Sequence, residues 1–239
     1  MFTRPHHQRI AKVLESLDAD LLKRHNCLFA GGTAIALGYG EYRESVDIDF
    51  LVSDLASYRY LRNLVREQGL QALMKSTDAS QLQTSDIRSD QYGIRTRVFV
   101  KGKPIKFEIV LEGRISLAKP GQKDSILGVA TLMKIDMAVS KLLANSDRGL
   151  DMGMHCRDVI DLAMLNLSKS EFAEAAIKGE AAYGAAILKD LARVIGMLGE
   201  ANGLLERCMK AMDVSVPRAL LWQNISKVKS YIANGKPNG

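Results

Sequence analysis

Three acidic side chains fall inside apolar stretches that have the pattern of β-strands. Asp47 and Asp49 lie in "SVDIDFLV", and Glu108 lies in "IKFEIVLE". Successive side chains of a strand point to opposite faces, so Asp47 and Asp49 share one face and their apolar neighbours take the other. Two carboxylates at this spacing, about 6–7 Å apart, repel each other unless water screens them or a cation bridges them.

Three acids that converge from strands of one sheet would supply the hard oxygen ligands that Mg²⁺ takes when it also holds phosphates. Two such ions could activate an attacking hydroxyl and stabilise a departing pyrophosphate. We expect Asp47 or Asp49 to bridge both ions. Glu108 is expected to bind the ion on the acceptor side and to assist removal of the acceptor proton. Taken singly, each acid is more often a solvated residue on a strand face.

The sequence "FAGGT" places Gly31, Gly32 and Thr33 shortly before these acids. Glycines at the end of a strand let the backbone approach a triphosphate, and the N–H groups that open the next helix point toward an anion. Thr33 adds a hydroxyl donor. A lone Gly-Gly is usually only a turn. The order and spacing of the glycines and the acids together predict a metal–triphosphate site.

The hydrophobic pattern predicts the elements that position these residues. Residues 8–24 predict one amphipathic helix, "CLFA" a strand, Thr33 the start of a brief helix, and Asp54 the cap of a helix that runs to about Gly69. "YGIRTRVFV" and "IKFEIVLE" alternate on either side of "KGKP" and predict a hairpin. The polar residues 71–90 predict a long loop or a poorly ordered excursion.

Beyond about Ser125 the pattern changes, because strand signals become scarce. We therefore expect an α+β protein with two domains, a short mixed sheet flanked by helices over residues 1–125 and a helical bundle over residues 126–239. The predicted helices of the second domain cover 132–146, 156–167, 170–196, 200–212 and 217–233.

The motifs together resemble a known superfamily. "FAGGT", "SVDIDF" and "KFEI" resemble the DNA polymerase β nucleotidyltransferase superfamily. More narrowly, "GGTAIAL" followed by "RESVDIDFLV" resembles the AbiEii-type toxin nucleotidyltransferases of abortive-infection and type IV toxin–antitoxin systems. A second block, "VSKLLANSDRGLDMGMHCRDVIDL", is similar to that family's helical lysine, arginine and R-D-x-x-D-L pattern. The resemblance covers roughly residues 25–165. The long gap "GLDMGMH" and the polar stretch 71–90 depart from the family pattern.

The resemblance implies a polymerase-β-like domain and a helical domain that contributes to the active-site cleft. Lys141 would be a catalytic lysine that reaches a nucleotide phosphate or the leaving pyrophosphate, and Asp158 would contact the nucleotide or orient Lys141. The roles of Arg148, Arg157 and Asp161 stay open. The predicted nucleotide contacts are Gly31, Gly32, Thr33, Arg43, Ser45 and Asp158.

The activity implied is Mg²⁺-dependent transfer of a nucleoside monophosphate from an NTP to an acceptor hydroxyl. The protein would be a toxin held in check by a cognate antitoxin, with tRNA as a possible acceptor. Two alternatives remain open, the same chemistry on a small acceptor such as an aminoglycoside, and a non-catalytic nucleotide-binding regulator. The net charge of +6 and pI of about 9.2 fit RNA better than a polycationic drug.

The remaining features favour a cytoplasmic protein that makes no use of a membrane. The three cysteines are dispersed and form no CxxC pair, which argues against a disulfide framework and a zinc site. No stretch approaches the ~18 apolar residues of a membrane span. The N-terminus "MFTRPHHQRI" lacks the apolar region of a signal peptide.

Overall fold

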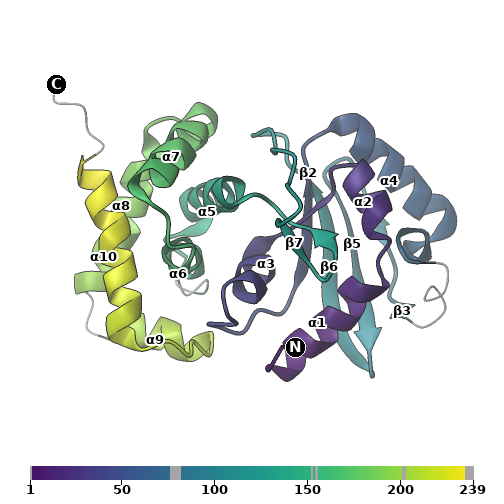
Figure 1. Ribbon diagram of the computed structural model, residues 1–239, viewed down its shortest axis with the longest axis horizontal. Coiled ribbons are helices and arrows are strands. Elements are labelled where there is room, and N and C mark those ends of the chain that lie inside the picture. The colour runs from purple at the N-terminus through teal and green to yellow at the C-terminus, as the bar shows by residue number, and fades with distance from the viewer. Residues whose placement is uncertain (1, 76–81, 152, 154–155, 201–202, 235–239) are drawn as a thin grey trace. The chain divides into compact units, whose positions relative to one another are not determined.

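The computed structural model describes residues 2–75, 82–151, 153, 156–200 and 203–234. The chain folds into two compact units, shown in Figure 1. The first unit holds Met1–Glu41 and Ser45–Met133. The second holds Tyr42–Glu44 and Lys134–Gly239. The division therefore falls later than residue 125, and a short segment before the first acids belongs to the helical unit.

A mixed sheet forms the first unit. The described strands run in the order β1-β2-β6-β5-β3, and β4 also pairs with β5. Strands β2 and β6 are parallel, and the other neighbours are antiparallel. A separate two-stranded hairpin, β7 with β8, is absent from the sequence-based prediction. The strands are β1 (Leu28–Ala30), β2 (Ile48–Val52), β3 (Gln83–Thr84), β4 (Arg88–Ser89), β5 (Gly93–Val100), β6 (Lys103–Leu111), β7 (Ser125–Ile126) and β8 (Val129–Ala130).

One face of this sheet is apolar, and helices cover it. The side chains of Ile48, Phe50, Phe107 and Ile109 are fully buried on that face. Helix α1 contacts β5, and α4 contacts β2. The core of the unit therefore lies between the sheet and these helices, and the alternate strand positions are left for charged residues. The helices of this unit are α1 (Pro5–Ser16), α2 (Ala19–Arg24), α3 (Gly31–Gly38), α4 (Leu55–Gln68) and the 3₁₀ turn η1 (Leu70–Leu73).

The helix after Asp54 and the hairpin are confirmed. The Asp54 carboxylate accepts a hydrogen bond from the backbone N–H of Ser57, 2.6 Å away, and Gly69 ends the helix with a φ of 75°. The hairpin turn is tighter than the expected "KGKP". Only Lys101 and Gly102 lie between the strands, both with positive φ, as a two-residue turn requires.

The single helix predicted over residues 8–24 is wrong. Helix α1 ends at Ser16 and α2 begins at Ala19. Leu17 forms an isolated β-bridge with Met74, and the Asp18 carboxylate accepts a hydrogen bond from the N–H of Leu21. A partner far along the chain and a local cap thus interrupt a continuous hydrophobic pattern.

The predicted loop over residues 71–90 is also wrong in part, because η1 extends into it and β3 and β4 lie within it. Residues 76–81 lie outside the described part of the chain. Strands β3 and β4 both pair with β5, so their register is set by a strand that follows them in the sequence.

The second unit is a helical bundle, and the α+β prediction is confirmed. Helix α5 contacts α6, α7 and α8, and α10 contacts α6. The single helix predicted over 170–196 is two helices, because Gly184 adopts a φ of 69° between them. The helix predicted over 200–212 includes residues 201–202, which lie outside the described chain. The helices are α5 (Lys134–Arg148), α6 (Arg157–Met164), α7 (Lys169–Tyr183), α8 (Ala186–Glu200), α9 (Leu204–Ala211) and α10 (Arg218–Asn234).

None of the helices in the described chain combines the length and the hydropathy that crossing a membrane demands. All three cysteines are buried free thiols. The cytoplasmic location stays a prediction.

Candidate active site

The parallel pairing of β2 with β6 brings two of the three predicted acids side by side. Asp49 is the register partner of Glu108. Directly paired residues of adjacent strands have Cβ atoms roughly 4.5–5.5 Å apart on one face. Asp47 directly precedes β2, two residues before Asp49. The register therefore places Asp49 and Glu108 side by side on one face of the sheet, and Asp47 lies just before β2; their convergence on one metal site stays a prediction.

Two basic side chains form ion pairs with the carboxylate of Glu108. Its Oε1 lies 3.2 Å from Nε of Arg95, and its Oε2 lies 2.7 Å from Nζ of Lys106. Glu108 is 14% exposed, whereas Arg95 and Lys106 are 40% and 50% exposed. Within the described chain no three His, Cys, Asp or Glu side chains converge closely enough to hold a metal ion. The carboxylates are therefore neighbours by register, and the side chain of Glu108 is turned toward the two cations.

Gly31 lies against Asp49 at the start of α3. A Cβ added to Gly31 would stand 2.5 Å from Oδ2 of Asp49, and the φ of Gly31 is 72°. Any other residue would collide with this carboxylate and would also adopt a left-handed backbone conformation. Gly31 thus leaves the space that the Asp49 carboxylate fills. It also begins a helix whose first N–H groups have no intrahelical partner.

Thr33 is buried and holds the segment that leads into β2. Its hydroxyl oxygen lies 2.8 Å from Oγ of Ser45 and 2.5 Å from the backbone carbonyl oxygen of Asp47. Thr33 therefore fixes the backbone that carries the first acid. The predicted contacts of Thr33 and Ser45 with a nucleotide stay predictions.

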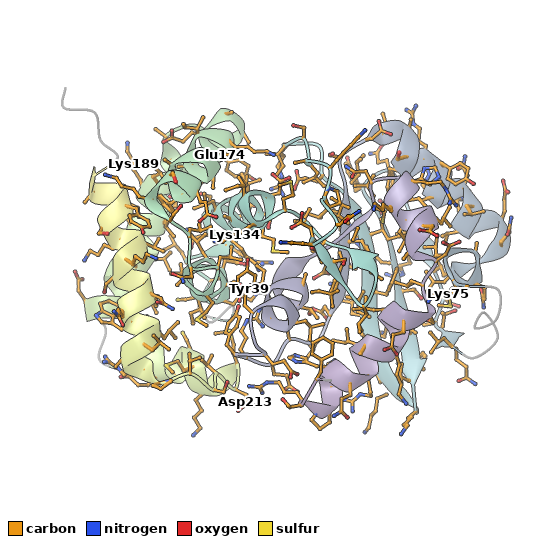
Figure 2. All side chains as sticks on the ribbon, viewed as in Figure 1. Tyr39, Lys75, Lys134, Glu174, Lys189 and Asp213 are labelled. Atoms are coloured by element: carbon orange, nitrogen blue, oxygen red, sulfur yellow. The ribbon has the colours of Figure 1, made fainter. Side chains whose placement is uncertain are left out.

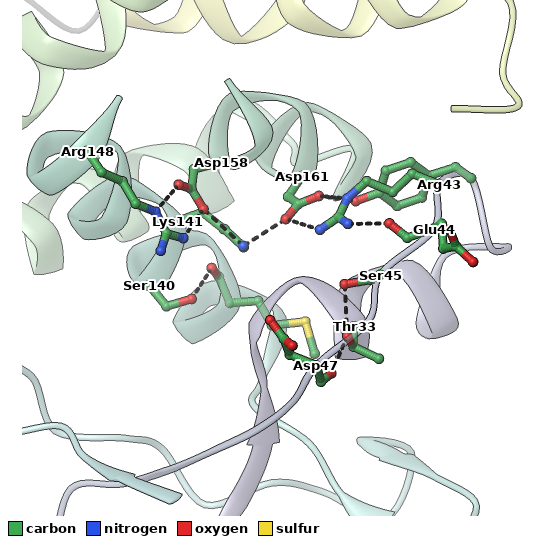
Figure 3. A network of polar contacts seen from close by, with 12 residues as sticks. Thr33, Arg43, Glu44, Ser45, Asp47, Ser140, Lys141, Arg148, Asp158 and Asp161 are labelled. Carbon is green, nitrogen blue, oxygen red and sulfur yellow. Dashed lines mark hydrogen bonds and ion pairs between the residues drawn. The ribbon is translucent and has the colours of Figure 1, made fainter. Parts of the chain in front are cut away.

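A second charged cluster lies in the helical unit and centres on Asp161, as Figure 3 shows. Arg43 donates two hydrogen bonds to the Asp161 carboxylate, at 2.6 and 2.8 Å. The Tyr42 hydroxyl donates to it at 2.5 Å, and Nζ of Lys141 lies 2.7 Å from its other oxygen. Asp161 is fully buried. A buried carboxylate is stable only when such donors satisfy it, and here three do.

Asp158 extends this cluster along α5 and α6. Nζ of Lys141 lies 3.1 Å from its Oδ1, and Arg148 donates two hydrogen bonds to its carboxylate at 2.8 and 3.0 Å. Lys141 and Asp158 are both buried. The ammonium group of Lys141 is thus shared between two aspartates.

The pKa values of this cluster follow from the same contacts. Burial alone would raise the pKa of Asp161, but Lys141 and Arg43 hold it well below its usual range. Burial likewise opposes the lowering of the Asp158 pKa, which Lys141 and Arg148 cause. Burial would lower the pKa of Arg43, yet Asp161 raises it. Both carboxylates are therefore ionised at neutral pH, and the cluster is a set of fixed charges.

A sequence model of the nucleotidyl transferase AbiEii toxins of type IV toxin–antitoxin systems matches residues 12–213. The chain belongs to this family. No curated protein sequence matches it. As an AbiEii protein, the chain is a nucleotidyltransferase enzyme and a toxin of a type IV system.

Solved structures share the AbiEii protein's fold. JHP933 from Helicobacter pylori aligns with a TM-score of 0.59 and 17% sequence identity, over 98% of this chain and 93% of that one. MenT4, a nucleotidyltransferase toxin from Mycobacterium tuberculosis, aligns with a TM-score of 0.51 and 13% identity, over 98% and 87% of the two chains. At such identities the similarity concerns the fold, which extends over both units of the AbiEii chain.

The AbiEii protein's predicted site residues have different surroundings in the structure. Arg43, a predicted nucleotide contact, is buried and forms an ion pair with Asp161. Asp158 contacts Lys141, as the expectation that it orients this lysine requires. The parts of Lys141 and Asp158 in catalysis or nucleotide binding stay predictions, as do those of Gly31 and Gly32. Arg148 and Asp161, whose roles the sequence left open, both form ion pairs in the buried cluster.

Sequence reasoning missed His7. No histidine stands among the predicted site residues, but His7 is completely buried and contacts Glu41 and Ser45. The apolar spacing of α1 around His7 carried a weak signal of burial. Nothing local in the sequence identified its partners, which lie 34 and 38 residues away.

Proposed function

We propose that this AbiEii protein transfers a nucleoside monophosphate from an NTP to a hydroxyl group of RNA, with Asp47, Asp49 and Glu108 as ligands of Mg²⁺. One observation carries the proposal, the register that pairs Asp49 with Glu108 while Asp49 lies against Gly31. That arrangement sets two carboxylates beside the start of a helix, where anionic phosphates are favoured.

The donor set fits Mg²⁺ in its chemistry. Carboxylate oxygens are the ligands this ion prefers, and it normally keeps open positions for substrate phosphates. Glu108 must turn away from Arg95 and Lys106 to join the set, and the exposure of both partners makes that exchange inexpensive. When bound, Mg²⁺ would neutralise phosphate charge and polarise the phosphoryl group.

The chain's own groups would carry the remaining work. The N–H groups of Gly31 and Gly32, at the start of α3, would bind phosphate oxygens. In the reaction, the acceptor oxygen forms a bond to the α-phosphorus of the NTP, and the bond from that phosphorus to pyrophosphate breaks. The acceptor hydroxyl loses its proton, and we assign the carboxylate of Glu108 as the base that takes it.

The sheet continues from the acids into a row of basic residues, which supports a polyanionic acceptor. Arg95 is the register partner of Glu108, and Arg88 is the partner of Arg95. On the same face Arg97 pairs with Lys106. We call these four residues, Arg88, Arg95, Arg97 and Lys106, the basic row. Its charge would attract the phosphates of RNA and repel a polycationic drug.

Label transfer tests the function. The protein is incubated with Mg²⁺ and each α-labelled NTP, together with total tRNA or a panel of aminoglycosides. The variants are Asp47→Ala/Asp49→Ala and, as a matched control, Lys189→Ala on α8 (Figure 2). We expect label on tRNA with the wild type and the control, and none with the double variant.

Each other outcome has a definite meaning. Label on an aminoglycoside would show that the acceptor is a small molecule and not RNA. Labelling that persists in the double variant would exclude the carboxylate mechanism. No labelling of any acceptor would favour a non-catalytic regulator. Growth arrest on expression that Glu108→Ala relieves would connect the transfer activity to toxicity.

A further inference from the structure

His7 joins two points of the chain that flank the segment Tyr42–Glu44. Its Nδ1 lies 2.8 Å from Oε1 of Glu41, and its Nε2 lies 3.1 Å from the backbone nitrogen of Ser45. Tyr42–Glu44 belong to the helical unit, whereas Glu41 and Ser45 belong to the first unit. The imidazole ring therefore spans the place where the chain leaves the first unit and returns to it.

These contacts define the tautomer of His7. A backbone N–H can only donate, so Nε2 must accept from Ser45 and carries no proton. Nδ1 then carries the proton and donates it to the Glu41 carboxylate. Burial lowers the pKa of His7 more than Glu41 raises it. The ring is thus neutral at physiological pH.

Glu41 is itself held firmly by the start of α1. Its carboxylate accepts hydrogen bonds from the backbone N–H groups of Thr3, at 2.7 Å, and Arg4, at 3.2 Å. Burial opposes ionisation, but the bonds from Thr3, His7 and Arg4 lower the pKa of Glu41 to about 2. Glu41 also adopts a φ of 53°, which is uncommon for a residue other than glycine. A fixed anion therefore holds the Nδ1 side of the ring.

The neighbouring histidine binds the next peptide group. Nε2 of His6 lies 2.9 Å from the carbonyl oxygen of Val46, to which it donates, and Arg9 donates to Nδ1 of His6 at 2.9 Å. His6 and His7 together hold the N–H of Ser45 and the C=O of Val46. Both groups lie within two residues of Asp47, and Thr33 binds the same segment from α3.

We propose that His7 is a positioning residue, which fixes the backbone of Ser45 so that Asp47 is held in place for catalysis. This inference rests on the proposed function. The effect is transmitted through the Ser45 N–H and the short segment 45–47, and His7 contacts no reacting atom. Misplacement of a reacting group by about 1 Å can cost on the order of a hundredfold in rate.

The same geometry predicts an acid limb in the pH profile of kcat. Protonation places a hydrogen on Nε2. Because Nε2 can then no longer accept from the Ser45 N–H, this hydrogen bond is lost and the two donors repel each other. The groups facing the ring are Glu41, which favours the charged form, and Arg4 and His6, which disfavour it. Activity should therefore fall as the pH drops through the lowered pKa of His7, below about 6.5.

Two neutral substitutions test the contacts of the two ring nitrogens separately. The amide of His7→Gln reaches about as far as Nε2 and can accept from Ser45. The amide of His7→Asn reaches only about as far as Nδ1, so it can serve Glu41 but not Ser45. We expect His7→Asn to lose about tenfold or more in kcat and His7→Gln to stay within about threefold of the wild type. His7→Gln should also lose the acid limb.

Equal kcat values for the two variants, at melting temperatures within a few degrees, would overturn the proposal. An acid limb that persists unchanged in His7→Gln would overturn it as well. Nitrogen-15 NMR of the histidine rings tests the arrangement without any activity. A neutral His7 with its proton on Nδ1 at pH 7.5 is expected, and the other tautomer or a charged ring would contradict it. If the wild type transfers no label, the proposed function fails while the NMR result still decides the geometry.

Discussion

The two charged clusters of this protein differ in how firmly their carboxylates are held. In the sheet, Glu108 contacts two half-exposed cations by single ion pairs, and Asp49 lies beside it on the next strand. In the helical unit, Asp161 is fully buried and bound by Arg43, Tyr42 and Lys141. The exposed pairs cost little to break and the buried ones cost much. Ligand binding therefore suits the sheet cluster, whereas the buried ion pairs of the helical cluster contribute mainly to stability; the catalytic part of Lys141 and the nucleotide contact of Asp158 stay predictions.

The largest effect should come from the sheet cluster. Asp49→Asn keeps the shape of the side chain but removes the charge beside Glu108. We expect the rate of label transfer to fall by about a thousandfold or more, since the electrostatic groups of an active site contribute on this scale. The melting temperature of the variant, measured in parallel, shows that it is folded. A folded Asp49→Asn variant that keeps its activity would contradict the assignment.

The opposite pattern is expected for the helical cluster. Asp161→Asn removes the buried counter-charge of Arg43 and leaves Lys141 with Asp158 alone, which should cost about 3–5 kcal/mol of unfolding free energy. Urea denaturation of the variant measures this loss. Glu206→Gln is the matched control, because it breaks an exposed ion pair with Arg218 and should leave stability nearly unchanged. Equal unfolding free energies of the two variants would show that the buried ion pairs contribute no more to stability than an exposed one.

The pH dependence of stability should follow the helical cluster. The pKa values of Asp158 and Asp161 are lowered in the folded state, so their contribution is present above the unfolded pKa, about 3.9, and is lost as the pH falls below it. The unfolding free energy should therefore drop between about pH 4 and pH 2. Denaturation at several pH values should show a shallower drop for Asp161→Asn, and an identical slope would contradict the assigned charges.

The smallest effect concerns the basic row. Arg97→Ala removes one exposed cation, so RNA binding should weaken modestly and the slope of log affinity against log salt should fall by about 1. Lys189→Ala, which removes a cation from α8, should change neither quantity. Filter binding across a range of salt concentrations measures both. An equal change in the two variants would indicate a response to net charge rather than an RNA contact at the basic row.

Local patterns predicted a good part of the fold. The alternation in β5 and β6 gave the hairpin, and Asp54 and Gly69 marked the ends of α4. Asp49 and Glu108 could be assigned to the face opposite the buried apolar residues because strand periodicity decides it. The break between α1 and α2 could not be predicted, because it depends on the bridge from Leu17 to Met74.

The candidate site was predictable to a similar extent. The acids and the glycines stand in one compact stretch, and their chemistry is apparent from residue type. The partners of Glu108 and Arg43 were not, because Arg43 meets Asp161 across 118 residues. Burial of His7 depends on Glu41 and Ser45 in the same way. Partners far apart in sequence leave no periodic signal in a single chain.

Titration with Mn²⁺ in the presence of a non-hydrolysable NTP tests the central claim most directly. Calorimetry would compare the wild type with Asp49→Asn and with folded Asp161→Asn at low temperature. We predict that the wild type and Asp161→Asn bind the ion with similar affinity and that Asp49→Asn does not bind it. Unchanged binding by Asp49→Asn, or loss of binding only in Asp161→Asn, would contradict the assignment of the sheet acids as the metal site.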